Sequence, residues 1–357
     1  MASHGVRRFK PTEKTAEEKE RELRKIDEYK SLERLVAEKV ARKEYSVETL
    51  KEISDLLTRN PEYYTVWNYR RQVLQDQFSN TAKSDEESSS SAIAQLISDD
   101  LMFLMPLLRS FPKCYWIWNY RVWLLDEARR LLPLASATQF WQQELILVGK
   151  MLTLDSRNFH GWSYRRLVVE TLQQLATSAE AASLTQKEYE YAKKMIGANL
   201  SNFSAWHYRT KLIVRLLEEQ SASDEERRKM LDDELDLIHQ ALIDPYDQSL
   251  WFYHQNLMSV FDPTLAHRTM APNLSSSERL SYLRNEIAAI EEMLDGAEDC
   301  KYIYQSLIEC MLLIAKVAGQ LSPEDRSHIL GWLSELKQLD PLRKNRWLDF
   351  EKTLANL

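Results

Sequence analysis

Two cationic residues stand at equivalent places beside a repeated tryptophan and could hold an anion. Lys113 and Arg157 each lie five residues before a tryptophan, in what we expect to be the first turn of a helix. A helix N-terminus favours anions, so a cation there is unfavourable unless an anion binds beside it. Tyr115 and Phe159, three residues before the same tryptophans, would add aromatic surface. The alternative is that both cations are solvated or paired with a nearby carboxylate.

The tryptophans belong to a five-fold internal repeat. The motif Trp-x-Tyr-Arg, with histidine replacing arginine in the last copy, recurs at Trp67, Trp118, Trp162, Trp206 and Trp251. The steps between successive tryptophans are 51, 44, 44 and 45 residues. A period of this size with two helices per unit is typical of a solenoid. The first step is seven residues longer than the next, and we expect the excess in an exposed, mobile loop over Ser79 to Ala92.

Each repeat is expected to be a hairpin of two helices. Asn60-Pro61 and Asp244-Pro245 separate an upstream helix from the one that carries the tryptophan, and Asn or Asp before Pro predicts a helix that begins at the proline. In that second helix the Trp and the Tyr two residues later project on opposite sides. Such a helix packs on its hairpin partner with one side and on the next repeat with the other, so all ten motif aromatics are expected in the core.

The motif arginines need partners if they are buried. We expect them to donate forked hydrogen bonds to carboxylates or helix-end carbonyls, or to stack on an aromatic ring. These residues are Arg70, Arg121, Arg165 and Arg209. We call this pairing of the motif residue with its partner a clamp. In the fifth repeat His254 takes the place of arginine, so the clamp is predicted to be weaker there.

Composition narrows the class of protein. The chain has 357 residues, 44% of them apolar, with only 7 Gly and 10 Pro, which favours a folded, all-α protein. The net charge of −7 is spread along the chain and gives no reason to expect nucleic acid as a partner. No stretch approaches the roughly 18 apolar residues of a membrane span. Three scattered cysteines suit a reducing compartment, and we expect the cytoplasm.

Elements outside the five repeats complete the predicted organisation. Residues 1–14 are expected to be a flexible tail and residues 15–357 a single solenoid domain, which begins with one long helix. Residues 280–357 are expected to form a degenerate region that closes the end of the stack, with Tyr302 as the centre of a possible sixth copy. The seven histidines form no HExxH motif, and there is no glycine-rich phosphate loop, so the chain alone is no evident enzyme.

The pattern Pro-x-x-Tyr-x-x-Trp-x-Tyr-Arg, recurring from Asn60 to Met258, resembles the repeats of the protein prenyltransferase α subunits. The segments "DSRNFHGWSYRRLVVE", "NLSNFSAWHYR" and "DPYDQSLWFYH" look most like the type II, or Rab geranylgeranyltransferase, branch of that family. The resemblance implies a crescent-shaped, right-handed solenoid of helical hairpins wrapped around a β subunit. Larger members carry immunoglobulin-like and leucine-rich domains, and this chain resembles a compact form without them.

The resemblance also implies an activity. In this family the α–β heterodimer transfers geranylgeranyl from geranylgeranyl diphosphate to C-terminal cysteines of Rab GTPases, which an escort protein delivers. The β subunit, not the α subunit, holds the zinc and the lipid pocket. The zinc lowers the pKa of the substrate thiol, and positive groups stabilise the departing diphosphate.

Site residues follow from the matched segments. The resemblance aligns Arg157 with a lysine that approaches the diphosphate, and Lys113 is the second catalytic candidate. The substrate-binding candidates in the same stretches are Tyr115, Asn158, Phe159, His160, Asn202 and Phe203. In similar α subunits an N-terminal histidine beside glycine can reach the zinc of the partner, which makes His4 a candidate metal ligand; a disordered tail is the alternative.

Two other functions compete with this interpretation. One is the α subunit shared by farnesyltransferase and type I geranylgeranyltransferase. The other, of a different class, is a non-catalytic scaffold of tetratricopeptide type, whose repeat of about 34 residues is shorter than the period seen here. Co-expression would separate the three, since each predicts a different β subunit or none.

Overall fold

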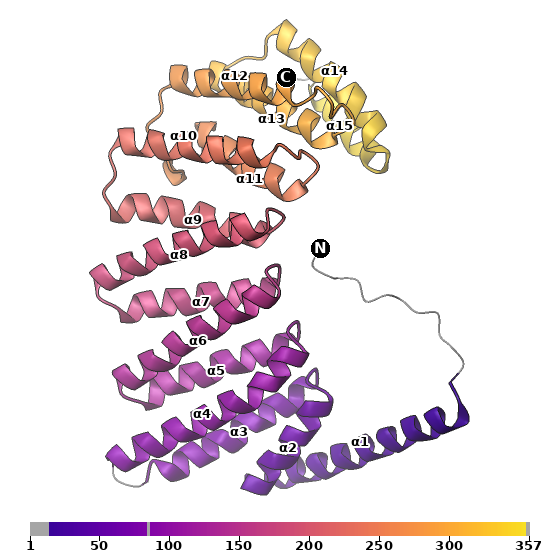
Figure 1. The fold of residues 1–357 in the computed structure, drawn as a ribbon, viewed down its shortest axis with the longest axis vertical. Helices are drawn as coiled ribbons and strands as arrows, with labels where there is room; N and C mark the ends of the chain where they lie inside the picture. Colours follow the sequence, from indigo (N-terminus) through magenta and orange to yellow (C-terminus); the bar gives the residue numbers. More distant parts are fainter. Residues whose placement is uncertain (1–13, 84–85, 355–357) are drawn as a thin grey trace. The chain divides into compact units, whose positions relative to one another are not determined.

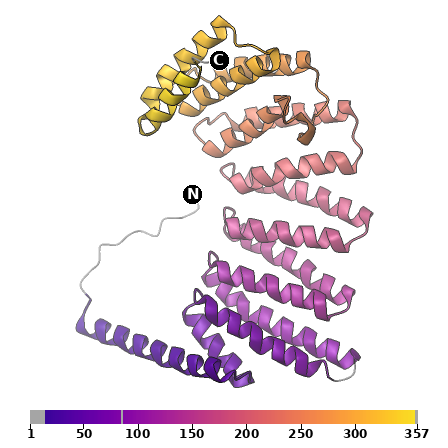
Figure 2. The same cartoon turned by 180° about the vertical axis from the view of Figure 1, so that it is seen from behind.

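The computed structural model describes residues 14–83 and 86–354, which form fifteen α-helices and three short 3₁₀ helices and contain no strand. The chain divides into two compact units, Met1–Thr177 and Ser178–Leu357. Figures 1 and 2 show the hairpins of each unit following one another in chain order. The prediction of an all-α solenoid of helical hairpins is confirmed. The tail over residues 1–14 and the single domain over 15–357 stay predictions.

The first unit consists of one long helix and three hairpins. The hairpins are α2–α3, α4–α5 and α6–α7, and α3 and α5 also contact the second helix of the next hairpin. The helices are α1 (Ala16–Arg42), α2 (Val47–Arg59), α3 (Tyr64–Thr81), α4 (Glu86–Ser110), α5 (Tyr115–Leu131), α6 (Leu134–Leu154) and α7 (Phe159–Leu175). Helix α1 ends in a left-handed residue at Lys43 and begins at a capping box in which Thr15 and Glu18 bond each other's backbone N–H groups.

The second unit contains four hairpins and one inserted segment. The helices are α8 (Ser178–Ala198), α9 (Phe203–Glu219), α10 (Asp224–Ala241), α11 (Gln248–Met258), α12 (Ser276–Glu292), α13 (Lys301–Ala318), α14 (Pro323–Leu339) and α15 (Lys344–Leu354). The 3₁₀ helices are η1 (Ser259–Phe261), η2 (Ala266–Arg268) and η3 (Pro341–Arg343). The first two lie in the insertion between α11 and α12.

The second helix of each hairpin begins later than the sequence predicts. Helix α3 starts at Tyr64, so Pro61 is not its first residue but lies in the connecting turn. Asn60 caps no helix N-terminus; its side chain accepts a bond of 3.2 Å from the N–H of Glu62 and closes the turn. The same turn recurs at Asp155 and Asp244, each of which accepts from the backbone N–H two residues on. The predicted start was wrong because these short side chains bond locally instead.

Because the second helix of each hairpin begins late, a backbone carbonyl before it is available to accept a hydrogen bond from the motif tryptophan. In all five repeats the indole Nε1 donates to the carbonyl oxygen six residues earlier, over 2.6 to 2.9 Å; the pairs are Trp67–Pro61, Trp118–Pro112, Trp162–Ser156, Trp206–Leu200 and Trp251–Pro245. If the helix began at the proline, these carbonyls would be drawn into helical bonds. All ten motif aromatics are at most 6% exposed, as predicted.

Arg70, Arg121 and Arg209 of the motif each pair with a carboxylate of the following hairpin. Arg121 donates through Nε to Glu144 over 3.0 Å, a second bond joins its Nη2 to the other oxygen, and both side chains are buried. Tyr164 of the next repeat donates to the same carboxylate over 2.6 Å, and burial raises the pKa of this phenol, so it keeps its proton. Equivalent clamps join Arg70 to Asp100 and Arg209 to Glu234. The prediction of forked bonds is confirmed for these three arginines.

A different clamp closes the fifth repeat. His254 is fully buried and makes one bond, of 2.8 Å, to Glu286 of α12. His239 of α10 contacts both oxygens of the same carboxylate, over 2.8 and 3.0 Å. Burial alone would raise the pKa of Glu286, but the two histidines outweigh it and lower this pKa to about 2. The hydrogen bond to Glu286 in turn raises the pKa of His239.

Two degenerate repeats follow the fifth. Tyr304 donates from its hydroxyl to the carbonyl of Glu298, six residues earlier, over 2.9 Å, as each motif tryptophan does. Tyr304, not Tyr302, therefore marks the sixth copy, and the prediction of Tyr302 was wrong by two residues. Trp347 stands six residues after Pro341, the spacing of Trp67 from Pro61, and is 7% exposed. It marks a seventh copy that the sequence analysis did not find.

The predicted serine-rich loop is mostly helical. Helix α3 runs to Thr81 and α4 begins at Glu86, and Ser89 is buried. Four of the seven excess residues of the first repeat lengthen α4, which has 25 residues where α6 and α8 have 21. Packing overrides the low helix propensity of a serine run. By length and composition Ser88–Ser110 could cross a membrane, a test that core helices also pass, and 39% of that window is buried.

Candidate functional site

The two predicted cations lie in neighbouring connecting turns of the first unit. Lys113 precedes α5 and Arg157 precedes α7, each two residues before the helix begins. Asp155 links the turns: its Oδ2 lies 3.9 Å from the Nζ of Lys113, and its Oδ1 accepts from the backbone N–H of Arg157 over 3.2 Å. The Lys113 side chain is 51% exposed, and Arg157 is exposed as well. Both cations therefore stay accessible, with one carboxylate between them.

Aromatic rings surround these turns. Tyr115 and Phe159 are the first residues of α5 and α7 and are 53% and 63% exposed. The His160 ring lies 4.0 Å from that of Phe159 and 6.3 Å from that of Tyr115, measured between centroids. Burial lowers the pKa of His160, so its imidazole is neutral at neutral pH. The structure thus brings three of the predicted substrate residues into one cluster.

Sequence reasoning missed two members of this cluster. The rings of Tyr64 and Trp116 stack with centroids 5.3 Å apart, and Trp116 also meets Tyr115 edge to face at 5.3 Å. Tyr64 is 51% exposed. It stands three residues before Trp67, the place that Tyr115 and Phe159 occupy in their own repeats, so the repeat pattern could have identified it.

The two predicted asparagines are buried and position the backbone. Asn158 is 3% exposed; its Oδ1 caps α7 by accepting from the N–H groups of His160 and Gly161, and its Nδ2 donates to the Pro112 carbonyl over 2.9 Å. Asn202 is fully buried and caps α9 by accepting from the N–H of Ala205. The Asn158 amide fastens the turn that holds Arg157 to the turn that holds Lys113.

Phe203 lies in the second unit and is 47% exposed at the start of α9. Its ring meets that of Phe252 edge to face, with centroids 5.7 Å apart, and stacks on His207 at 6.1 Å. These rings line a cavity of about 400 Å³ that extends along α9 and α11.

The described residues contain no group of three or more His, Cys, Asp or Glu side chains that could hold a metal ion. Cys114, Cys300 and Cys310 are free and buried, and burial raises the pKa of each thiol. Cys114 and Cys300 donate to the carbonyls of Pro61 and Pro245, so both serve the repeat interface. His4 lies outside the described residues.

Comparison with known proteins agrees with this architecture. A family model, the protein prenyltransferase alpha subunit repeat, matches residues 47–77, 97–128, 141–172 and 185–216, each of which covers most of one hairpin. The chain is also similar to the geranylgeranyltransferase-I of Candida albicans in complex with GGPP, with a TM-score of 0.61 and 21% identity over 92% of this chain and 91% of that one. At this identity the likeness shows the fold alone.

Sequence relatives are more specific. The geranylgeranyl transferase type-2 subunit alpha of Schizosaccharomyces pombe is 35% identical over 99% of both chains. The subunit of the same name from Candida albicans is 40% identical over 44% of this chain, an alignment that spans only 40% of that relative. The hairpin repeats, the matched family model and the full-length similarity agree, and the chain therefore belongs to the protein prenyltransferase α-subunit family, on the branch of the geranylgeranyl transferase type-2 α subunits.

Proposed function

We propose that this chain is the α subunit of a heterodimeric geranylgeranyl transferase of type 2. With its β subunit it transfers geranylgeranyl from geranylgeranyl diphosphate to C-terminal cysteines of Rab GTPases, presented by an escort protein in the cytoplasm. The observation that carries this proposal is the 35% identity to the type-2 α subunit of Schizosaccharomyces pombe over the whole of both chains. The type I and farnesyl alternative rests on fold similarity at 21% identity and is the weaker candidate.

The proposed role of the first unit is to bind the diphosphate. Lys113 and Arg157 are exposed cations on adjacent turns, and Asp155 contacts the ammonium of Lys113 and the backbone N–H of Arg157. A diphosphate would replace the weak 3.9 Å contact of Lys113 and receive charge-assisted hydrogen bonds from both cations. Positive groups placed there stabilise the negative charge that grows on the leaving diphosphate as the bond to the isoprenoid breaks. The guanidinium of Arg157 can donate two parallel bonds, which a lysine cannot.

The predicted substrate-binding residues fall into two groups according to how exposed their side chains are. We assign Tyr115, Phe159 and His160 to substrate contact, because their rings are accessible beside the two cations. We assign Asn158 and Asn202 to positioning, since both are buried: Asn158 caps α7, which carries Phe159 and His160, and Asn202 caps α9, which carries Phe203. Phe203 remains a proposed substrate contact on the second unit.

Zinc is proposed for the β subunit. The described residues of this chain offer no set of nitrogen, sulfur and oxygen ligands of the kind a tetrahedral zinc site needs. Zinc bound by the partner would supply activation of the substrate thiol. We keep His4 as a candidate ligand toward that zinc; an unchanged zinc environment in the His4→Ala heterodimer would exclude it.

One co-expression experiment tests the function. The chain should co-purify with a type-2 β subunit, and that complex should prenylate an escort-bound Rab. Preference for a β subunit of the CaaX type would favour the alternative instead. Failure to bind either would overturn the proposal.

A second experiment tests the site. The double variant Lys113→Ala/Arg157→Ala should assemble normally with the β subunit and lower the single-turnover rate by about 100-fold or more, the effect of losing one or more stabilising donors. Lys51→Ala/Arg129→Ala, which removes two exposed cations of α2 and of the last turn of α5, is the matched control and should keep the wild-type rate. Unchanged single-turnover rates in the first variant would remove both residues from the site.

A further inference from the structure

Asp155 occupies a position of the repeat at which an uncharged side chain can close the same turn. Its Oδ1 accepts a hydrogen bond of 3.2 Å from the backbone N–H two residues on. Asn60 of the first repeat and Asn199 of the fourth also stand seven residues before the motif tryptophan. Their amide oxygens accept from the equivalent N–H groups over 3.2 and 3.0 Å. The turn therefore requires an oxygen acceptor at this position but not a negative charge.

The negative charge of Asp155 faces Lys113. The second carboxylate oxygen, Oδ2, lies 3.9 Å from the Nζ of Lys113, and the side chains of the lysine and the aspartate are 51% and 28% exposed. Hydrogen bonds between nitrogen and oxygen are about 2.7–3.2 Å long, so the two groups attract each other without a hydrogen bond between them. The ammonium is therefore close to the carboxylate and can still move to another anion.

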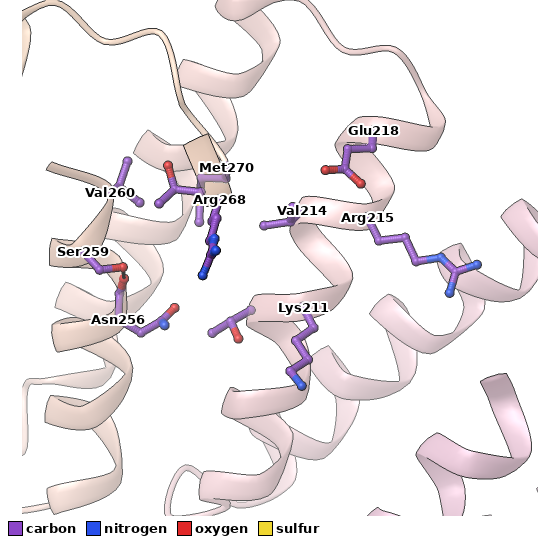
Figure 3. Close-up of a pocket in the computed structure, with 11 residues that line it drawn as sticks. Lys211, Val214, Arg215, Glu218, Asn256, Ser259, Val260, Arg268 and Met270 are labelled. Atoms are coloured by element: carbon purple, nitrogen blue, oxygen red, sulfur yellow. Dashed lines mark hydrogen bonds between the residues drawn. The ribbon is translucent and has the colours of Figure 1, made fainter. Parts of the chain in front are cut away.

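An ion pair of similar exposure in the second unit is closed. Figure 3 shows Arg215 of α9 beside a cavity of about 540 Å³ that residues of α9, α11, η1 and η2 line. The Nε of Arg215 lies 2.7 Å from a carboxylate oxygen of Glu219, and the two side chains are 43% and 22% exposed. Exposure alone therefore does not keep Lys113 and Asp155 apart. A charge-assisted hydrogen bond holds its cation, whereas an open pair releases it more easily.

A diphosphate bound by Lys113 and Arg157 would meet Asp155 as a like charge. The carboxylate contacts both turns, through Oδ2 on the Lys113 side and through Oδ1 at the backbone N–H of Arg157. Like charges at short range repel, and the repulsion grows with the charge of the anion. Free diphosphate has one more ionisable oxygen than a diphosphate ester of an isoprenoid. The carboxylate therefore disfavours the diphosphate product more than the substrate.

We propose that Asp155 is a resident counter-ion that limits the affinity of Lys113 and Arg157 for diphosphate and so favours release of the diphosphate product. Asp155 competes with the diphosphate for the ammonium of Lys113, and its charge repels the anion. It acts through Lys113 and is a positioning residue. This inference rests on the proposed function, which assigns the diphosphate to these two cations.

Inhibition of the α–β complex by inorganic diphosphate tests this role. Asp155→Asn keeps the oxygen that closes the turn and removes the charge. The inhibition constant of diphosphate should therefore fall by about three- to five-fold, as expected for the loss of one exposed ion pair. The single-turnover rate should not fall, because both cations remain. Asp244→Asn makes the same charge change at the exposed, equivalent position of the fifth repeat, whose oxygen accepts from the N–H of Tyr246, and should be inhibited as the wild type is.

A double-mutant cycle shows whether Asp155 acts through Lys113. In the Lys113→Ala background, Asp155→Asn should change the inhibition constant by less than about two-fold. An equal change with and without Lys113 would overturn the inference. An unchanged constant in Asp155→Asn, with weaker inhibition in Lys113→Ala/Arg157→Ala, would also overturn it and leave the proposed function intact. Undiminished inhibition in Lys113→Ala/Arg157→Ala would overturn both the inference and the proposed diphosphate site.

Discussion

The Arg121 clamp of the first unit and the His254 clamp of the second fill the same position of the repeat with different chemistry. Arg121 is permanently charged and donates two hydrogen bonds to Glu144, to which Tyr164 adds a third. His254 donates one bond to Glu286, and His239 from another helix supplies the rest. The arginine keeps its charge over the physiological pH range, whereas the histidine version contains His239, whose pKa is raised by its hydrogen bond to Glu286 and whose charge depends on pH.

The difference coincides with a change in the stack. Arg121 stands where one regular hairpin meets the next, with turns of similar length on either side. His254 stands just before the insertion of residues 259–275, where the regular spacing ends. The comparison indicates that the repeat needs a buried carboxylate with several donors, and that the donors themselves can be exchanged.

Removing the carboxylate of the arginine clamp should have the largest effect. Glu144→Ala leaves Arg121 buried without its counter-charge, which should lower the free energy of unfolding by about 3–5 kcal/mol. Urea denaturation of the full-length chain measures this. Glu170→Ala, at an exposed position of α7, is the matched control and should change stability by less than about 0.5 kcal/mol. A loss of under about 1 kcal/mol for Glu144→Ala would mean that the clamp is not a structural requirement.

The histidine clamp should make stability depend on pH. The pKa of Glu286 is lowered to about 2, so its contribution is complete above its unfolded value near 4.5 and is lost as the pH falls toward 2. The pKa of His239 is raised, so its contribution is complete below its unfolded value near 6.5 and is lost as the pH rises through the higher, folded value.

Glu286→Gln should therefore lower the free energy of unfolding by up to about 3 kcal/mol near pH 6, since one pKa unit corresponds to about 1.4 kcal/mol. The loss should become smaller as the pH rises through the folded pKa of His239, above which this imidazole is neutral in both states. Unfolding curves of wild type and variant at several pH values check this, and the effect of Glu144→Ala, measured alongside, should stay constant between about pH 6 and pH 8. An equally constant effect of Glu286→Gln would contradict the role given to His239.

The sixth repeat should show the smallest effect. Tyr304→Phe removes the hydroxyl that bonds the Glu298 carbonyl and should lower the free energy of unfolding by about 1 kcal/mol. Tyr302→Phe, two residues earlier on α13, removes a hydroxyl without such a bond among the described contacts and serves as the control. Thermal unfolding of both variants is sufficient, and a larger loss from Tyr302→Phe would place the sixth copy where the sequence analysis had it.

Much of the fold is visible in the sequence because the motif residues are chemically demanding. An indole, a phenol and a guanidinium at fixed spacing predicted the hairpin repeat, the buried aromatics and the need of Arg121 for a carboxylate. The carboxylate itself could not be identified, because Asp100, Glu144 and Glu234 lie 30, 23 and 25 residues after their arginines and differ in type. Their spacing depends on how each helix packs, which a local pattern does not contain.

The candidate site was only partly visible. Lys113 and Arg157 were found by their place before the tryptophan, but the link through Asp155 was not, because it depends on a turn that was taken for a helix start. Trp116 was missed since no repeat pattern marks it.

In the first six copies a hydrogen bond joins the motif ring to the carbonyl six residues before it and so fixes the length of this local stretch of chain. The distance between successive rings meanwhile varies from 43 to 53 residues over the seven copies, from Trp67 to Trp347. Natural variation in length should therefore accumulate between these six-residue windows and avoid their interior. Related chains can gain or lose whole loops there while every hairpin keeps its registration.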